Sequence, residues 1–334
     1  MSETAMLSVP TRGWVLDAFG GPEVLRLEER ATNPPGEDEV LLDVEVAGVN
    51  FGDTMIRRGE YLRNQPLSMG PGCEVVGRVA IAGRNATVAE NARVAGWVEA
   101  GGAYANRVIV PAHRVYPVPD DIPAGAIAAL FLQGTTAEYG VNMYGRLAAG
   151  EVLLVHGAAG GVGSVAVQLG KIAGGRVIAT ASSEAKRDAV LEQGADVVLD
   201  SRDPDSLTRR VFEESDGRGC DVVLDGIGGP LFLPSLKGLA VHGRYVVVGS
   251  ATQQPAAFDA RHLLVRNQTV CGFILANINA RDPAEPSRAL LHLCDLVRNG
   301  ELHPRYETVP LEQAPEVHRL MEDRKLSGKV VLEP

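Results

Sequence analysis

Residues 151–163, EVLLVHGAAGGVG, form an apolar run that ends in glycines and alanines, and residues 162–175 continue as VGSVAVQLGKIAGG. The run Val152–Val155 predicts a buried parallel strand. The glycines predict a tight turn whose backbone N–H groups point at a phosphate, because a bare backbone can approach a ligand closely. Val165 and Leu169 then lie at helical spacing. Strand, turn and helix in this order are typical of a dinucleotide pyrophosphate site.

The glycine pattern departs from the usual dinucleotide fingerprint at one position. Ala158 stands where the first glycine is usual, Gly160 and Gly163 hold the second and third places, and Gly161 is an extra glycine. Tight glycine turns also occur in sheets that bind nothing. The turn therefore predicts either a nucleotide site or a purely structural turn, and the rest of the chain has to decide.

Length and charge restrict the class of protein. The chain has 334 residues, and single cores rarely grow beyond roughly 250 to 300 residues, so we expect two domains. The formal net charge is −10, and the longest basic clusters are pairs such as Arg57-Arg58 and Arg209-Arg210. We expect no nucleic-acid partner, because phosphate-backbone binding needs concentrated positive charge. An anionic coenzyme needs only a few local cations.

Cysteine spacing and hydropathy indicate a cytoplasmic protein. Cys73, Cys220, Cys271 and Cys294 are far apart and form no Cys-x-x-Cys pair, so neither a zinc lobe nor a disulfide framework is expected. The N-terminal residues lack the basic start and apolar core of a signal peptide. No apolar run approaches the ~20 residues needed to span a bilayer, so no membrane partner is expected.

The first third of the chain is rich in short β-like runs. Glycine and proline turns separate predicted strands at 39–49, 74–83, 92–98 and 104–111. No helix of convincing length is predicted before about Pro123. The pattern favours a compact β-rich domain, a distorted barrel, over the start of an alternating sheet.

Strands and helices alternate after the glycine turn. Further strands are predicted at 176–181, 196–199, 221–229, 243–250 and 269–274, with helices between them. Six strands with crossover helices predict a doubly wound parallel sheet, an α/β fold whose ligand crevice lies at the carboxyl ends of strands one and four.

The C-terminal strands are expected to return to the first domain, which makes the sheet domain an insertion and places the active cleft between the two domains. The predicted division is 1–124 with 266–334 for the β-rich domain and 125–265 for the nucleotide domain.

The end of the second sheet strand favours NADPH over NADH. In such sheets a carboxylate at this place accepts hydrogen bonds from the ribose 2′-hydroxyl of NAD. This chain has Ser182 and Ser183 there, with Lys186 and Arg187 one turn later to neutralise a 2′-phosphate. The alternative is that the two cations form a solvated helix face that follows a Ser183 N-cap and Glu184 in the first turn.

Several short stretches occur in one order along nearly the full length of the chain. They are AGVNFGD at 47–53, PGCEVVG at 71–77, GAYANRVIVP at 102–111, QGTTA at 133–137, VHGAAGGVG at 155–163, DVVLDGIGG at 221–229, GRYVVVG at 243–249 and GKVVL at 328–332. Together they resemble the zinc-independent quinone oxidoreductases of the medium-chain dehydrogenase/reductase superfamily. This resemblance implies a GroES-like catalytic domain, a Rossmann domain, NADPH as hydride donor and a homodimer.

The resemblance also explains why no metal is expected. Alcohol dehydrogenases of the superfamily hold zinc with a cysteine where this chain has Asn50 and with a histidine where it has Cys73. Asp53 and Glu74, which accompany that site, remain, but catalytic zinc needs about three protein ligands. Without a Lewis acid the acceptor has to be activated already, as a quinone or an electron-poor enone is.

The predicted catalytic residues are hydrogen-bond donors or aligning groups. Asn50 is the first candidate donor to the acceptor oxygen, with capping of its own loop as the alternative. Tyr61 donates a hydrogen bond or stacks on a quinone, or is a wall residue. Gln133 and Thr136 approach the nicotinamide carboxamide in this family, or else form a polar helix start. The coenzyme contacts that the resemblance implies are Asn50, Thr136, Ala159, Gly160, Gly161, Val162, Ser182, Lys186, Gly226, Gly249, Phe273 and Lys329.

Two departures from the family pattern keep other functions open. Met55 and the pair Asp200-Ser201 stand where the family often has tyrosines; the first bears on the acceptor and the second on coenzyme contacts. An NADPH-dependent enone or enoyl reductase is the second candidate, and it needs an acid to protonate the α-carbon. A non-catalytic NADPH-binding protein is the third.

Overall fold

The computed structural model describes residues 8–61, 67 and 70–334. The chain divides into two compact units, Met1–Phe131 with Tyr306–Pro334 and Leu132–Arg305. Within the described residues, no helix is long and apolar enough to cross a membrane.

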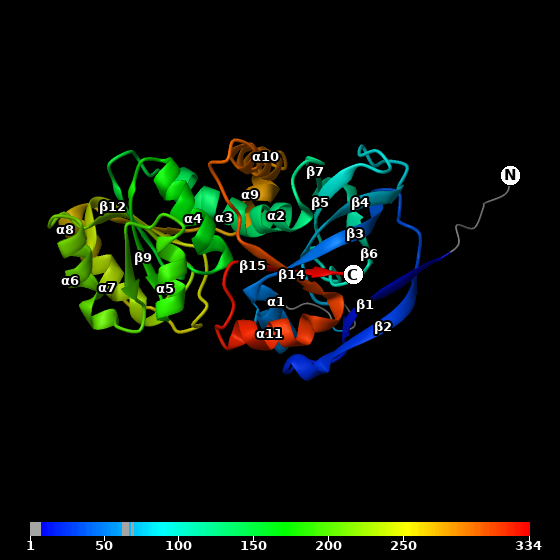
Figure 1. Cartoon of the computed structure of the whole chain (residues 1–334), viewed down its shortest axis with the longest axis horizontal. Helices are drawn as coiled ribbons and strands as arrows, with labels where there is room; N and C mark the ends of the chain where they lie inside the picture. Colours follow the sequence, from blue (N-terminus) through cyan, green and yellow to red (C-terminus); the bar gives the residue numbers. More distant parts are fainter. Residues whose placement is uncertain (1–7, 62–66, 68–69) are drawn as a thin grey trace. The chain divides into compact units, whose positions relative to one another are not determined.

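The first unit is built on a seven-stranded sheet with the order β14-β15-β3-β4-β5-β7, in which β6 also pairs with β3. Its strands are β3 (Glu39–Val49), β4 (Glu74–Ala82), β5 (Arg93–Trp97), β6 (Arg107–Pro111), β7 (Val115–Pro117), β14 (Tyr306–Pro310) and β15 (Lys329–Glu333). Residues from both ends of the chain thus share one sheet, as predicted, because β15 pairs with β3 (Figure 1). Valines such as Val40, Val75 and Val94 form the core, as expected for β-branched side chains on pleated strands.

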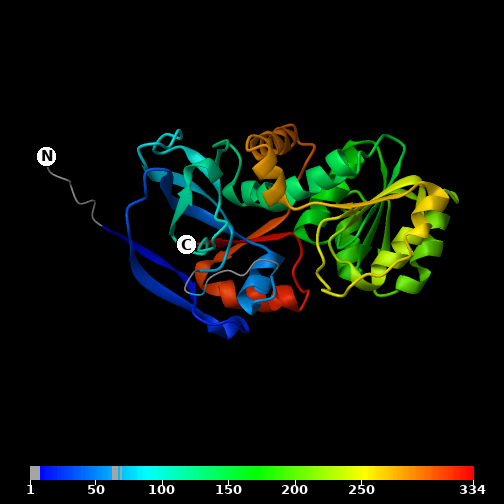
Figure 2. The ribbon, with the colours of Figure 1, turned by 180° about the vertical axis from the view of Figure 1, so that it is seen from behind.

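Smaller elements complete the first unit. An antiparallel hairpin joins β1 (Val9–Leu16) to β2 (Leu25–Thr32), with the short helix η1 (Pro22–Val24) between them (Figure 2). The helices are α1 (Phe51–Arg58), η2 (Ala112–Arg114), α2 (Ala124–Ala128), η6 (Leu311–Gln313) and α11 (Ala314–Glu322). Helix α1 matters for function because Asn50, a candidate site residue, is its N-cap.

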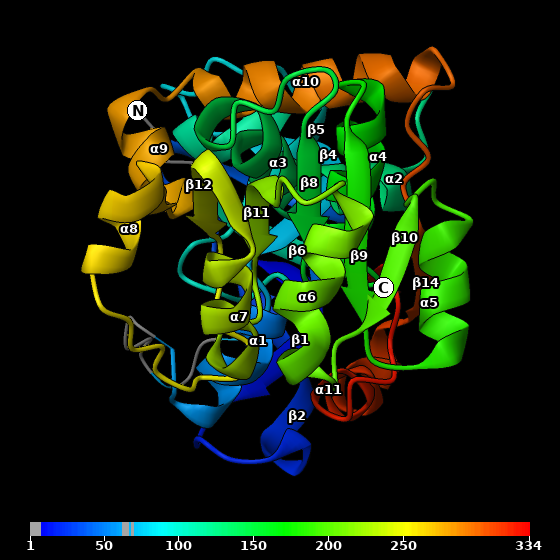
Figure 3. The same ribbon diagram turned by 90° about the vertical axis from the view of Figure 1, so that its left-hand side faces the viewer.

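The second unit contains the predicted doubly wound sheet. Six parallel strands run in the order β10-β9-β8-β11-β12-β13 (Figure 3). They are β8 (Val152–Val155), β9 (Arg176–Ala181), β10 (Val197–Asp200), β11 (Cys220–Asp225), β12 (Leu239–Val247) and β13 (Thr269–Gly272). The first sheet strand β8 therefore lies beside the fourth, β11, at the point where the strand order reverses. This arrangement confirms the α/β fold class and places the predicted ligand crevice at the carboxyl ends of these two strands.

Helices cover the sheet of the second unit. Helix α4 contacts β8 and β9, α5 contacts β9 and β10, and α7 contacts β12. The helices are α3 (Thr135–Glu138), α4 (Gly161–Ile172), α5 (Glu184–Leu191), α6 (Pro204–Glu214), η5 (Gly229–Leu231), α7 (Phe232–Lys237), α8 (Arg261–Arg266), α9 (Leu275–Arg281) and α10 (Glu285–Arg298). The helical segment 124–144 also contains two π-helical stretches, η3 (Ala129–Gly134) and η4 (Tyr139–Tyr144). Such stretches are frequent at functional sites.

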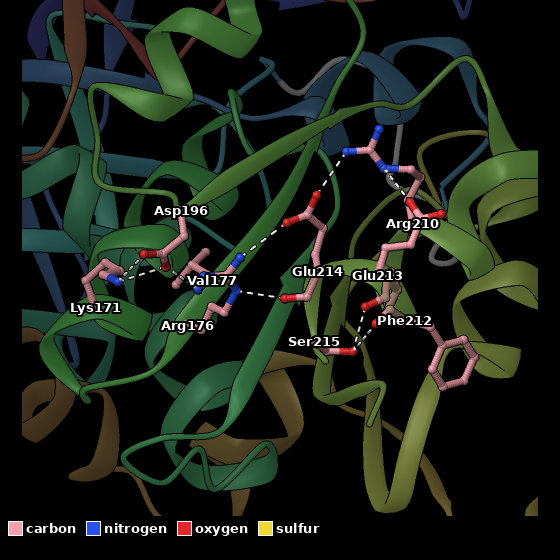
Figure 4. Close-up of polar contacts among 10 residues, drawn as sticks. Lys171, Arg176, Val177, Asp196, Arg210, Phe212, Glu213, Glu214 and Ser215 are labelled. Carbon is pink, nitrogen blue, oxygen red and sulfur yellow. Dashed lines mark hydrogen bonds and ion pairs between the residues drawn. The ribbon is translucent and has the colours of Figure 1, made fainter. Parts of the chain in front are cut away.

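Ion pairs fix the amino-terminal edge of this sheet, away from the candidate residues. Asp196 accepts hydrogen bonds from Lys171 Nζ at 2.8 Å and from the backbone N–H of Val177 at 2.7 Å (Figure 4). Glu214 joins Arg176 to Arg210 at 3.2 and 3.0 Å (Figure 4). These ion pairs therefore fix the amino-terminal ends of the strands, and the candidate residues lie at the opposite, carboxyl ends.

The structure differs from the sequence analysis at several elements. The hairpin β1–β2 and helices α1, α8 and α9 were not predicted, and α1 precedes Pro123, where no helix was expected. The compact units divide after Phe131 and Arg305 rather than at 124/125 and 265/266. The segment 266–305 lies in the second unit because β13 pairs with β12 and α10 contacts α3.

Candidate active site

The turn after β8 leads directly into the N-terminus of α4. Gly157 has φ = +62°, a left-handed conformation that favours glycine. Gly160 is the N-cap of α4, and because glycine has no side chain, it does not cap the first N–H groups of the helix. The first N–H groups of a helix have no intrahelical acceptor, and together with the helix dipole they form an anion site. Ala159, Gly160, Gly161 and Val162 line this start of the helix.

Gly163 allows α4 to pack against the turn that precedes it. A Cβ atom at this position would lie 2.6 Å from Ala158 Cα and would overlap the carbonyl oxygen of Gly157. Ala158 itself is fully buried, and its N–H donates to Thr180 O at 3.1 Å. The third glycine of the pattern is therefore required by the close packing of α4 on the turn, and the alanine at the first position fits the turn.

Gln133 lies against the start of the same helix. A Cβ atom on Gly161 would overlap the Gln133 carboxamide, so the two residues are in direct contact. Thr136, one turn further on, uses its hydroxyl to donate a 2.7 Å hydrogen bond to Leu132 O of its own helix. The structure thus brings Gln133 to the phosphate turn.

The second and third sheet strands end in a cationic group of side chains. Half-buried Lys186 and Arg187 lie on α5, whose N-cap Ser183 accepts from the Lys186 N–H at 3.3 Å. Arg187 is 3.3 Å from Asp200 Oδ2, and Arg202 contacts the same oxygen at 2.6 Å. Hydrogen bonds from Arg202 lower the pKa of Asp200. The carboxylate at this edge is therefore neutralised by two guanidinium groups.

Asp200 and Arg202 were missed as members of this group. Ser182 follows β9, and Asp200 ends β10 directly opposite Ala181, so the strand register brings the two strand ends together. The sequence did place an acid at the end of the third strand, but only the structure shows that Arg187 and Arg202 bind it.

A second pair of glycine turns lies at the ends of β11 and β12. Asp225 is fully buried, and its Oδ1 accepts from the N–H groups of Ile227 at 2.7 Å and Gly228 at 2.9 Å. Its Oδ2 accepts a 2.7 Å hydrogen bond from the Tyr245 hydroxyl. Burial raises the pKa of Tyr245, so the phenol stays a neutral donor. This network, which sequence reasoning missed, fixes the turn that contains Gly226.

The two turns also bind each other. The Gly226 carbonyl oxygen accepts from Ala251 N–H at 3.0 Å, and a Cβ atom at Gly249 would lie 3.1 Å from the same oxygen. The predicted coenzyme residues Gly226 and Gly249 are therefore neighbours. Phe273, the predicted contact after β13, stacks on Tyr144 with ring centroids 4.7 Å apart.

The candidate acceptor residues of the first unit form a polar cluster around a buried ion pair. Asn50 Nδ2 donates to Glu74 Oε1 at 2.8 Å, and Asn50 Oδ1 accepts from Lys329 Nζ at 3.0 Å. Lys329 and Glu74 form an ion pair in which both side chains are fully buried. Cys73 Sγ is 3.6 Å from Asn50 Nδ2. Two predicted residues, Asn50 and Lys329, thus meet although 279 positions separate them.

Asp53 connects this cluster to a second buried network. Its Oδ2 accepts from the Asn50 backbone N–H at 2.8 Å and from the Tyr104 hydroxyl at 3.0 Å. The Tyr104 hydroxyl also lies 3.2 Å from His318 Nε2. Burial raises the pKa of Asp53 to about 6 and lowers the pKa of His318 to about 3. Asp53 therefore helps to hold the backbone of Asn50 in place.

Two further observations concern Tyr61 and Cys73. Tyr61 Cε2 lies 3.4 Å from the position of a Cβ atom on Gly52, so the ring covers the start of α1 near Asn50. Burial, and then the charges of Asp53 and Glu74, raise the pKa of the Cys73 thiol well above its usual value. Cys73 is therefore held as a thiol.

The cluster does not fit a zinc ion. Among the residues that the structure describes, no three His, Cys, Asp or Glu side chains gather in a way that could hold a metal. Asn50, whose side chain is a neutral amide, and Cys73 occupy the two positions at which alcohol dehydrogenases of the superfamily have zinc ligands. Glu74 is paired with the Lys329 ammonium group. The Lys329 ammonium group already neutralises the Glu74 carboxylate that contacts Asn50 Nδ2, and we derive no step through a metal.

Comparison with known proteins agrees with the two units. Residues 36–120 match the family model of the alcohol dehydrogenase GroES-like domain, and residues 161–291 match that of zinc-binding dehydrogenase. Quinone oxidoreductase from Lama guanicoe is 31% identical over 321 residues, which cover 94% of this chain and 94% of that protein. The chain belongs to the quinone oxidoreductase family of the medium-chain dehydrogenase/reductase superfamily.

Solved structures of this family have the same fold as the chain. A mycobacterial protein in complex with NADPH is 33% identical, with a TM-score of 0.89 over 97% of this chain and 100% of that one. Escherichia coli quinone oxidoreductase in complex with NADPH is 29% identical, with a TM-score of 0.89 over 97% of this chain and 100% of that one. The fingerprint with Ala158 thus occurs in a chain of this quinone oxidoreductase family.

Proposed function

We propose that the protein is an NADPH-dependent oxidoreductase that transfers hydride to a quinone-type acceptor without a metal. The observation that carries the proposal is the Asn50–Glu74–Lys329 cluster, in which a neutral amide donor stands beside a buried ammonium group. The likeness to quinone oxidoreductases and to two proteins bound to NADPH supports it. A protein with this cluster needs an acceptor that is already activated.

The residues of the second unit fit NADPH. The uncapped N-terminus of α4 and the glycines that allow close approach suit the pyrophosphate. Lys186 and Arg187 suit the 2′-phosphate, because the nearby carboxylate of Asp200 is already neutralised and does not repel it. When bound, NADPH supplies a hydride from C4 of its nicotinamide ring. Gln133, Gly226, Gly249 and Phe273 then define where that ring is held.

The residues of the first unit fit an acceptor with a carbonyl oxygen. Asn50 Nδ2 donates to Glu74 Oε1 at 2.8 Å, and it lies 3.6 Å from Cys73 Sγ. Sulfur is a weak acceptor, so an oxygen that gains negative charge can replace it. Reduction of a quinone to a hydroquinone consumes one hydride and one proton. Asn50 would stabilise the oxygen, and Tyr61, whose ring lies against Gly52 at the start of α1, would cover the acceptor.

The proposal is tested by following NADPH oxidation with a panel of quinones, enones and enoyl thioesters. We expect turnover with 1,4-quinones and little with simple ketones. With deuterated NADPH, a saturated product that carries deuterium at the β-carbon of an enone would replace the quinone assignment by enone reduction. Tight binding of NADPH without turnover of any acceptor would leave a non-catalytic NADPH-binding protein.

We also propose that the protein forms a homodimer through the edge of its parallel sheet. Strand β13 is the last strand in the order of the described sheet, so its outer edge is available for pairing. Leu264 and Val265 on the adjoining α8 are 76% and 83% exposed. A second copy that pairs with β13 would cover these apolar side chains, and an isologous contact of this kind closes as a dimer.

A further inference from the structure

Strand register brings Lys329, Asn50 and Glu74 to one end of three neighbouring strands. Val330 of β15 is opposite Val49 of β3, so Lys329 faces Asn50, the residue that follows β3. Gly48 of β3 is opposite Glu74 of β4. A Cβ atom on Gly48 would overlap the Glu74 carboxylate, so glycine at this position makes room for the charged group. The cluster is thus fixed by backbone pairing.

The two charged neighbours determine which way the Asn50 amide points. Lys329 Nζ has only donors, and the Glu74 carboxylate has only acceptors while ionised. Asn50 accordingly directs Oδ1 to the ammonium group at 3.0 Å and Nδ2 to the carboxylate at 2.8 Å. An amide flip would set NH₂ against NH₃⁺ and C=O against COO⁻. Both contacts would be repulsive in a buried site, so the observed orientation is strongly favoured.

This orientation determines what Asn50 offers to a ligand. In this orientation, Asn50 Nδ2 faces Glu74 and Cys73 Sγ, and the distance from Nδ2 to Sγ is 3.6 Å. Cys73 and Asn50 are only half-buried, whereas Lys329 is fully buried. A ligand can therefore approach the cluster at Asn50 and Cys73, whereas Lys329 is shielded from it.

We propose that Lys329 is a positioning residue that acts through the Asn50 amide, which it holds with its N–H donor directed at the acceptor oxygen. This inference rests on the proposed function of Asn50 as the donor. It assigns to Lys329 a role different from the direct coenzyme contact predicted from the sequence. The ammonium group also polarises the amide through Oδ1, which makes Nδ2–H a stronger donor.

A double-mutant cycle tests the proposal with the full-length protein, NADPH and a 1,4-quinone. The variants are Lys329→Met, Asn50→Ala and the double variant, measured for kcat/KM of the quinone and for the Kd of NADPH by fluorescence. We expect Asn50→Ala to lower kcat/KM by about 100-fold, as loss of one oxyanion donor does. Lys329→Met should lower it by roughly 10-fold or more in the native background but less than about 2-fold beside Asn50→Ala. The Kd of NADPH should stay unchanged.

Each contrary result points to a separate failure. An equal loss from Lys329→Met in both backgrounds, or a raised Kd for NADPH, overturns the positioning role. An undiminished kcat/KM in Asn50→Ala shows instead that Asn50 is not the donor, which removes the basis in the proposed function. Lys325→Met is the control, because that lysine is exposed and its ammonium group pairs with Asp323 at the surface.

A second substitution keeps the test decisive if Lys329→Met does not fold. Lys329→Gln retains an N–H donor for Asn50 Oδ1 while removing the charge. We expect it to keep more activity than Lys329→Met and to show the same dependence on Asn50. Activity of Lys329→Gln that falls equally with and without Asn50, in a protein with native circular dichroism, overturns the proposal.

Discussion

Gly161, the first residue of α4, lies directly against the side chain of Gln133, and a Cβ atom at position 161 would overlap the Gln133 carboxamide. Alanine favours a helix over glycine by about 1 kcal/mol, so Gly161→Ala should help α4 on its own. We expect the substitution instead to displace Gln133 and to raise the KM for NADPH several-fold. Steady-state kinetics with varied NADPH measures the effect.

Removal of Gln133 provides the control for this prediction. In the Gln133→Ala background the collision no longer exists, so adding Gly161→Ala should change the KM for NADPH little. The same additional loss in both backgrounds would mean that position 161 matters through the phosphate turn rather than through Gln133.

Lys186 and Arg187 should determine the choice between NADPH and NADH. Both lie one turn into α5 at the end of β9, and Arg187 is already oriented by Asp200 at 3.3 Å. Lys186→Ala should raise the KM for NADPH at least about 10-fold, because a lost ionic contact of about 1.4 kcal/mol corresponds to a tenfold loss of affinity. The KM for NADH should change little. Lys171→Ala, at the opposite edge of the sheet, is the control. Equal effects on the two coenzymes would contradict the 2′-phosphate assignment.

Tyr245→Phe should loosen the turn that holds Gly226. The substitution removes only the hydroxyl that donates to Asp225 Oδ2 at 2.7 Å. A hydrogen bond to a buried charged group contributes about 1.5–3 kcal/mol, so the free energy of unfolding should fall by that amount. The Kd of NADPH should rise as well, because Asp225 then holds the turn through Oδ1 alone. Tyr306→Phe, at an exposed position, is the control for urea unfolding and NADPH titration.

If the proposed dimer forms through β13 and α8, charged substitutions on α8 should change the mass of the protein in solution from that of a dimer to that of a monomer. Leu264→Glu with Val265→Glu places two charges on the exposed face of α8 and should convert the protein to a monomer. Sedimentation velocity measures the result. Leu191→Glu, a half-exposed position on α5, should leave the mass unchanged. A native chain that sediments as a monomer would contradict the proposal directly.

Local patterns in the sequence predicted most of the coenzyme unit. The strand Val152–Val155 and the helix from Gly161 follow from an apolar run, a glycine turn and helical spacing, all within about twenty residues. The hairpin β1–β2 escaped prediction because Pro10 and Gly13 interrupt the first strand. Helix α1 escaped because it has only eight residues, and three of its polar or charged side chains, Asp53, Thr54 and Arg57, are buried, so the usual contrast between an apolar and a polar face is missing.

The candidate acceptor site was harder to predict, because its contacts are long-range. The resemblance indicated both Asn50 and Lys329, but nothing local indicates that residues 279 positions apart share a hydrogen bond. The same holds for Asp53, Tyr104 and His318, which come from three distant segments. Such contacts depend on the pairing of β15 with β3, which only the folded sheet defines.

The network of Asp53 and His318 predicts two opposite effects of pH on stability. Burial raises the pKa of Asp53 from 3.8 to about 6, so the folded state binds more protons than the unfolded state between these values, and stability falls as pH rises from 4 to 6. Burial lowers the pKa of His318 from 6.5 to about 3, so its contribution rises with pH over the same range. In the native protein the two contributions oppose each other.

Single substitutions should therefore separate the two contributions in urea unfolding at pH 4 to 6. Asp53→Asn keeps an acceptor for the Asn50 N–H and removes the titration, so its stability should rise with pH more steeply than that of the native protein, by about 2 kcal/mol between pH 4 and 6. His318→Gln keeps a polar partner for the Tyr104 hydroxyl, and its stability should rise less steeply or fall. Slopes that change in the same direction in both variants would show that the two groups do not titrate as the structure implies.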